Sequence, residues 1–139
     1  MKCEDIKELL PQRAPILMVD GLQDVDGEEA QTSFIVRPGN FFLDGEGLLE
    51  ASGLIEHIAQ SASAFAGYMA RLAGATEPPV GYIGEVKNFR CHHRSQVGDE
   101  LHTIIRLGPE VEGVMLLSGE TRVGERIVAE TQMKIFIRN

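Results

Sequence analysis

Three side chains that could do chemistry lie within one turn of a predicted helix: Glu56, His57 and Gln60. A carboxylate inside an apolar sheath has a raised pKa, which suits proton transfer, so Glu56 is the first candidate for an acid or base. The alternative is an exposed first-turn Glu56 that stabilises the helix dipole. Neighbouring helix positions point about 100° apart. His57 therefore need not face the same side, and a surface or interface histidine is its plainer interpretation.

The helix that would hold these side chains is predicted over Ala51–Ala73. Apolar residues recur there at helical spacing, and proline is absent. Most other positions are Ala, Ser or Gly, which suits a helix surrounded by other backbone, and the polar residues argue against a membrane span. Ser52 could cap the helix. Gly53 could let a ligand approach amide groups at the helix start, or it could be an ordinary first-turn residue.

The rest of the chain is predicted to be mostly strand. A short helix over Glu4–Leu10 ends at Pro11, and an aromatic, glycine-rich loop over residues 40–50 leads into the central helix. Short connections, including turns near Asp26-Gly27 and Gly108-Pro109, indicate antiparallel neighbours. The expected strands are 16–19, 29–36, 80–91, 100–107, 114–121 and 126–137. One long helix with about six strands predicts an α+β fold whose antiparallel sheet wraps over the helix.

Composition limits the class of protein. The 139 residues, 43% hydrophobic and 24% charged, are typical of one globular domain over 1–139. The net charge of -8 argues against nucleic-acid binding. The opening MKCEDIKELL has no signal-peptide hydrophobic region, which predicts a cytoplasmic protein. Cys3 and Cys91 lack metal-ligand spacing and are interpreted as unpaired thiols, so no metal is expected.

One basic segment contrasts with the acidic background. It holds Lys87, Arg90, His92, His93 and Arg94 within eight residues. Such a cluster could attract an acidic or phosphate-bearing partner. The alternative is a solvated strand edge whose charges prevent aggregation.

Several short motifs resemble the hotdog-fold 3-hydroxyacyl-[acyl-carrier-protein] dehydratases of the FabZ type. LLPQR at residues 9–13, with Pro15 and LMVD at 17–20, resembles the family's opening LLPHR-x-P-x-LLVD. Phe41-Phe42 resembles the aromatic pair before the active-site loop, and EHIAQ at 56–60 resembles the E-A-x-A-Q helix motif.

Further resemblances lie in the second half of the chain. Phe89 and Val97-Gly98-Asp99 resemble the strand and turn near the dimer-forming sheet. The run AGYMARLAG at 66–74 is similar to a divergent branch of dehydratase-like proteins that occur with aryl-polyene and related polyketide or fatty-acid pathways.

The resemblance implies a hotdog fold and a dimer, either of identical chains or with another hotdog subunit, that binds an acyl carrier protein or coenzyme A thioester without a cofactor. In the family, a loop histidine removes the C2 proton and the helix carboxylate, here Glu56, handles the leaving hydroxyl. A backbone amide polarises the thioester carbonyl. Expected substrate contacts are Gly53, Gln60 and Phe42. Expected carrier-protein contacts are Lys87, Arg90 and Arg94.

The loop departs from the family pattern, because Asp44–Gly47 contains no histidine. His57, Glu46, or one of His92 and His93 could replace it. Two other functions remain open. Glu56 alone could serve a thioesterase on the same fold, or the chain could be a catalytically silent subunit that binds acyl thioesters or pairs with an active dehydratase.

Overall fold

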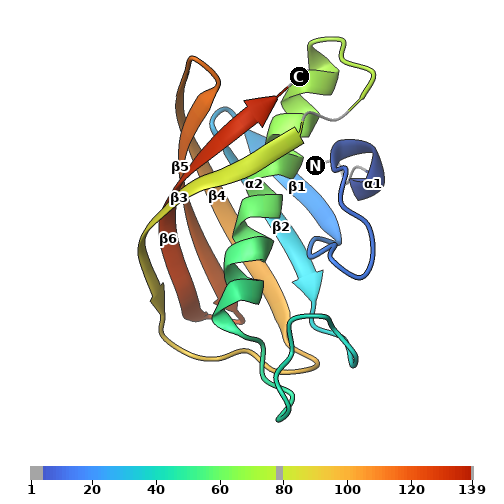
Figure 1. Ribbon diagram of the computed structural model, residues 1–139, viewed down its shortest axis with the longest axis vertical. Coiled ribbons are helices and arrows are strands. Elements are labelled where there is room, and N and C mark those ends of the chain that lie inside the picture. Colours follow the sequence, from blue (N-terminus) through green and yellow to red (C-terminus); the bar gives the residue numbers. More distant parts are fainter. Residues whose placement is uncertain (1–4, 78–79, 139) are drawn as a thin grey trace.

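A computed structural model describes residues 5–77 and 80–138. Six strands form one antiparallel sheet in the order β1-β2-β4-β5-β6-β3, and the long helix α2 lies along one face of it (Figure 1). The helices are α1 (Ile6–Leu9) and α2 (Ala51–Leu72). The strands are β1 (Gly21–Asp26), β2 (Glu29–Ile35), β3 (Val80–Cys91), β4 (Glu100–Val111), β5 (Val114–Val123) and β6 (Arg126–Arg138). The predicted architecture, an antiparallel sheet wrapped over one long helix, is confirmed.

The start of α2 differs from the prediction in one detail. Glu50 is the N-cap residue, and its side chain makes no capping hydrogen bond. Ser52 already lies inside the first turn, so the prediction that it caps the helix was wrong. The helix ends at Leu72, and Gly74 follows with a φ of 101°, a left-handed conformation that glycine adopts without strain.

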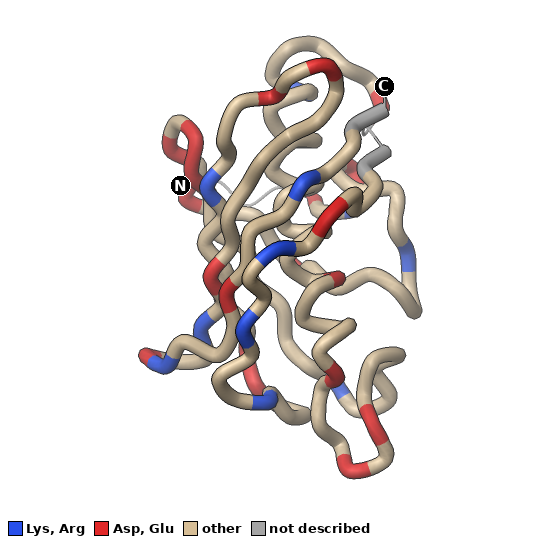
Figure 2. Tube along the Cα trace, turned by 60° about the vertical axis from the view of Figure 1, so that its left-hand side comes forward, with Lys and Arg blue, Asp and Glu red and all other residues tan. Residues whose placement is uncertain are grey.

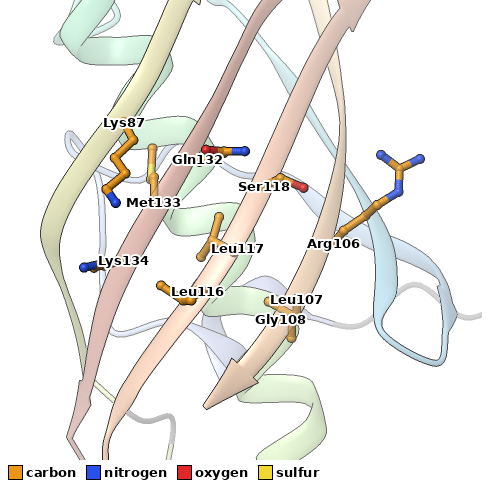
Figure 3. A pocket seen from close by; sticks show the side chains of 10 residues that line it. All are labelled: Lys87, Arg106, Leu107, Gly108, Leu116, Leu117, Ser118, Gln132, Met133 and Lys134. Atoms are coloured by element: carbon orange, nitrogen blue, oxygen red, sulfur yellow. The ribbon is translucent and has the colours of Figure 1, made fainter. Parts of the chain in front are cut away.

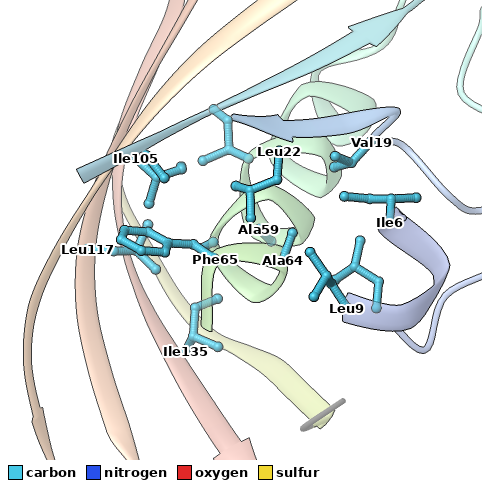
Figure 4. Packing of buried hydrophobic residues seen from close by; sticks show 14 of the residues in the cluster. Ile6, Leu9, Val19, Leu22, Ala59, Ala64, Phe65, Ile105, Leu117 and Ile135 are labelled. Carbon is cyan, nitrogen blue, oxygen red and sulfur yellow. The ribbon is translucent and has the colours of Figure 1, made fainter. Parts of the chain in front are cut away.

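The core lies between α2 and the inner face of the sheet. Figure 4 shows Phe65 pointing from α2 toward Ile105 and Leu117 on the sheet, while Leu9 of α1 approaches α2 from the other side. Phe65 is fully buried, and burial of such a side chain contributes about 1.5–3 kcal/mol. Gly67 allows this packing, because a Cβ there would collide with the Leu9 carbonyl oxygen.

Alternation along the strands determines which side chains face the helix. In β5, Met115, Leu117, Gly119 and Thr121 are buried, and the residues between them are more exposed. At Gly119 a Cβ would lie 2.6 Å from Cγ2 of Ile58, so glycine lets α2 approach the sheet closely. In β5 the charged residues Glu120 and Arg122 take the alternate positions, on the other face of the sheet.

One predicted strand and the end of another were wrong. Residues 16–19 belong to no strand. The amides of Ile16 and Leu17 bond to the Arg13 carbonyl in a turn, and side chains of α2 bond to the Ile16 carbonyl and to both backbone polar groups of Met18. Strand β4 does not end at Gly108-Pro109 but continues to Val111. An irregular register between Leu107 and Glu110 accommodates the proline, which has no N–H to donate.

The hairpin turn predicted near Asp26-Gly27 is confirmed, but the strand that enters it is β1 rather than the predicted strand 16–19. The hairpin between β1 and β2 turns at Gly27, which has a φ of 62°. The short first helix is confirmed as α1, although its predicted first residue, Glu4, lies outside the described residues. In the described part of the chain, no helix is both long and apolar enough to cross a membrane.

Candidate active site around Glu56

Glu56 lies in the second turn of α2 and is partly buried. Gln60, one turn further along, donates a hydrogen bond from Nε2 to Glu56 Oε2 over 2.6 Å. Among the described residues, no hydrogen bond reaches the second carboxylate oxygen. Glu56 is thus neither a fully exposed first-turn residue nor sealed in the core. It is an oriented carboxylate with one oxygen left for a ligand.

Gln60 is almost completely buried, and its amide is fully used by the protein. Oε1 accepts a hydrogen bond from the Met18 amide at 2.7 Å, and Nε2 donates to the Ile16 carbonyl at 2.9 Å as well as to Glu56. Because Nε2 has only two hydrogens, none is left for a substrate. This geometry supports a role in orienting Glu56 rather than the predicted substrate contact.

His57 points into the core, so the interpretation as a surface or interface histidine was wrong. Its ring is fully buried, with Nδ1 2.7 Å from the Met18 carbonyl and Nε2 2.7 Å from Thr103 Oγ1. Burial lowers its pKa to about 4, although the Met18 carbonyl and the charge of Asp20 act in the opposite direction. Both ring nitrogens are occupied, so the geometry does not support His57 as the base that acts on a substrate.

The side chain of Phe42 packs so closely against the start of α2 that only glycine fits at position 53. A Cβ at Gly53 would lie 2.6 Å from Phe42 Cβ, and the Gly53 amide donates to the Glu50 carbonyl at 2.9 Å. That amide is therefore not available to a thioester carbonyl. Phe42 is partly buried, while its edge-to-face neighbour Phe41 is 59% exposed at a centroid distance of 5.1 Å.

Asp44 and Arg94 hold the loop that precedes α2. Asp44 accepts hydrogen bonds from the amides of Glu46 and Leu48 at 2.8 and 3.1 Å, and it pairs with Arg94 at 2.9 Å. These backbone donors and then Arg94 hold the pKa of Asp44 below its usual value. Arg94 also donates to the Leu49 carbonyl. The guanidinium predicted to dock a carrier protein is therefore engaged within its own chain.

The other proposed bases do not come together with Glu56. Glu46 is exposed in the loop, and His92 pairs with Glu130 at 2.8 Å. His93 lines a surface cleft together with Arg94 and other residues. No hydrogen bond among the described residues joins Glu56 to Glu46 or to a histidine.

Lys87 and Arg90 of the basic segment lie on β3, an edge strand of the sheet, and His92, His93 and Arg94 follow the end of that strand. Figure 2 shows acidic positions interspersed with the basic ones along the strands. Lys87 lies 3.9 Å from Glu85, and Arg90 is paired in register with Glu130 on β6. Charge on this segment is thus partly neutralised.

A groove of about 420 Å³ lies beside this segment, on the face of the sheet away from α2 (Figure 3). Leu116 and Ser118 lie within it, and Lys87, Lys134 and Arg106 border it. The lysines already pair with Glu85 and the arginine with Glu29. Because the sheet separates this groove from α2, it is not part of the site around Glu56.

Comparison with known proteins identifies the family. The model of the ApeP-like family, described as ApeP dehydratase, matches residues 4–139. The chain belongs to the ApeP-like dehydratase family. A 3-hydroxyacyl-[acyl-carrier-protein] dehydratase FabZ from Syntrophotalea carbinolica is 30% identical over 135 residues, which cover 94% of this chain and 90% of the relative. Membership in the ApeP-like family confirms the FabZ-type resemblance and its divergent branch.

Solved structures support the fold of this ApeP-like chain. The dehydratase heterocomplex ApeI:P from Xenorhabdus doucetiae matches with a TM-score of 0.90 and 18% identity, covering 98% of this chain and 92% of the other. A hypothetical thioesterase with coenzyme A from Streptococcus pneumoniae matches with a TM-score of 0.66 and 10% identity, covering 85% and 84%. At these identities the similarity shows the fold alone, and it confirms the predicted hotdog fold.

Sequence reasoning missed Met18 and Thr103 as partners of the site. They lie 39 and 46 residues from His57 along the chain. No local pattern could have connected them to α2.

Proposed function

We propose that this chain is the Glu56-bearing subunit of a dehydratase that acts on 3-hydroxyacyl thioesters of an acyl carrier protein, and that a second hotdog subunit supplies the base. One observation carries the proposal. Gln60 orients the Glu56 carboxylate at 2.6 Å, while the adjacent His57 is turned into the core. The site thus has the family's acid without a base beside it.

The reaction needs both groups. A base removes the C2 proton, the electron pair of that bond forms the C2–C3 double bond, and the C3–O bond breaks. Glu56 in its acid form gives its proton to the departing hydroxyl, which leaves as water. Because a C2 proton is only weakly acidic, neither step proceeds well without the other. A subunit with only Glu56 therefore needs a partner for this elimination.

The comparisons support the two finer parts of the proposal. The FabZ relative is named as a 3-hydroxyacyl-[acyl-carrier-protein] dehydratase, which favours that substrate class. The ApeI:P structure is a dehydratase heterocomplex, which favours a hotdog partner of a different sequence. The motif at residues 66–74 favours a pathway of the aryl-polyene type.

The carrier protein would dock on the edge strand β3. Lys87 and Arg90 are exposed there and carry positive charge on a chain whose net charge is -8. Acidic carrier proteins would be attracted to this segment and repelled by most of the remaining surface. Arg94 contributes less, because Asp44 already neutralises it.

The deciding experiment compares the chain alone with the chain co-purified with a hotdog subunit whose active-site loop carries the family's histidine. A 3-hydroxyacyl thioester is supplied, and enoyl product and free thiol are followed together. We expect enoyl product only from the pair, and its loss in Glu56→Gln, which can still accept the Gln60 hydrogen bond. Enoyl product from the chain alone would contradict the need for a partner.

A second candidate function is a thioesterase. A lone oriented carboxylate can activate water or attack a thioester carbonyl without a histidine. Free thiol from the chain alone, lost in Glu56→Gln, would establish this function in place of the first. Binding of the thioester with neither product, also in the pair, would identify a catalytically silent subunit.

A further inference from the structure

A line of hydrogen-bonded side chains crosses the core between α2 and the sheet. His57 Nε2 lies 2.7 Å from Thr103 Oγ1 on β4, and Thr103 Oγ1 lies 2.7 Å from Thr121 Oγ1 on β5. All three side chains are fully buried. On its other side, His57 Nδ1 lies 2.7 Å from the Met18 carbonyl.

The direction of every bond in this line follows from the Met18 carbonyl, which can only accept. Nδ1 of His57 must therefore carry a hydrogen and donate it. In a neutral ring Nε2 is then an acceptor, so Thr103 donates its hydroxyl hydrogen to Nε2. The Thr103 oxygen in turn accepts from the Thr121 hydroxyl. Burial, which lowers the pKa of His57 to about 4, supports the neutral ring.

Met18 connects this line to Glu56. His57 holds the Met18 carbonyl, and Gln60 accepts the Met18 N–H at 2.7 Å. The same Gln60 amide donates to Glu56. His57 and Gln60 of α2 thus bind the carbonyl and the amide of Met18, and Gln60 also orients the Glu56 carboxylate.

We propose that His57 is a positioning residue: as the Nδ1–H tautomer, ordered by Thr103 and Thr121, it fixes Met18 and thereby the Gln60–Glu56 pair. Packing alone does not explain the arrangement. Apolar side chains at positions 57, 103 and 121 would fill the same space without removing an imidazole and two hydroxyl groups from water. The expected effect on turnover rests on the proposed function. The His57 tautomer and the hydrogen-bond geometry do not depend on that function.

The first test reads the tautomer directly, by nitrogen NMR of labelled histidine at pH 7. We expect His57 with hydrogen on Nδ1 and none on Nε2. Hydrogen on Nε2, alone or on both nitrogens, would overturn the proposal. In Thr103→Val, which removes the donor to Nε2, the His57 and Gln60 side-chain signals should shift. Thr131→Val is the matched control, because it is also a buried threonine of the sheet but lies outside the line.

The second test measures turnover by the chain paired with its hotdog partner. We expect Thr103→Val to lower kcat by about 10- to 100-fold at nearly constant KM, the size of effect that misplacement of a reacting group produces. Thr103→Ser, which keeps the hydroxyl, should restore kcat, and Thr131→Val should leave it unchanged. Wild-type kcat in a folded Thr103→Val would overturn the proposal.

The two tests separate the two proposals. If wild type is inactive with every partner, the dehydratase function fails, but the NMR signals of His57 and Gln60 still decide the positioning role. If Thr103→Val leaves both signals in place, positioning is rejected whatever the activity.

Discussion

Gln60 Nε2 and Glu56 Oε2 lie 2.6 Å apart on consecutive turns of α2, and Gln60 is in turn held by Met18 and Ile16. The direction of the carboxylate is thus set before any substrate binds. A carboxylate that is already oriented loses less conformational entropy in the transition state than a freely rotating one.

Removal of the Gln60 amide should impair both stability and turnover. Gln60→Met fills a similar volume but leaves the Met18 amide and Ile16 carbonyl unpaired, at a cost of about 1–3 kcal/mol in the free energy of unfolding. Turnover by the paired enzyme should fall as the carboxylate becomes mobile. Urea unfolding and kcat measure the two effects. Gln132→Met, on an exposed strand position, is the control and should change neither.

Acidification should destabilise the protein through His57. The pKa of folded His57 is about 4, below the usual histidine pKa of 6.5, so between these values the unfolded chain binds more protons than the folded one. The free energy of unfolding therefore falls as the pH falls through this window, by up to about 3 kcal/mol. Urea unfolding at several pH values between 7 and 4 measures the slope.

His57→Gln should flatten this pH dependence, because it removes the titrating group. An equally steep fall in the variant would show that another group is responsible. Asp44 is distinguishable, since its lowered pKa contributes stability that is lost only at pH values below its unfolded value of 3.8.

Carrier-protein affinity should depend on β3. Lys87→Glu combined with Arg90→Glu should weaken binding at least tenfold at low salt and less at high salt, because screening reduces the attraction. A binding titration measures this effect. Lys7→Glu combined with Arg126→Glu makes the same change in net charge at exposed positions outside β3 and should have a smaller effect. Equal losses from both variants would indicate attraction by net charge alone.

Gly67 should not tolerate a side chain. Gly67→Ala places a methyl group against the Leu9 carbonyl oxygen, so α1 must move away from α2. Such overpacking costs about 1–3 kcal/mol. Gly45→Ala is the control, because that glycine has open space around its Cα and should be nearly neutral. Thermal unfolding compares the two variants, and equal stability would contradict the close packing of α1.

Much of the fold could be predicted because its signals are local. Helical spacing over Ala51–Ala73 and alternation in residues such as 114–121 depend on near neighbours in the chain, and the order of short motifs identified the family. The strand predicted at 16–19 failed for a non-local reason. Its backbone groups bond to side chains of α2 rather than to another strand. Gln60 lies 42 residues from Met18 and 44 from Ile16, and His57 lies 39 residues from Met18.

By itself the sequence determined the family, the central helix and Glu56 as the candidate acid, because these depend on residue types at fixed spacing. Only the tertiary structure decided the role of the residue beside it. His57 is turned toward Thr103 and Met18, which reach α2 from distant parts of the chain. Arg94 likewise forms an ion pair with Asp44, 50 residues away. Which hydrogen-bond partner a polar side chain finds depends on packing between elements, and no spacing within one element specifies it.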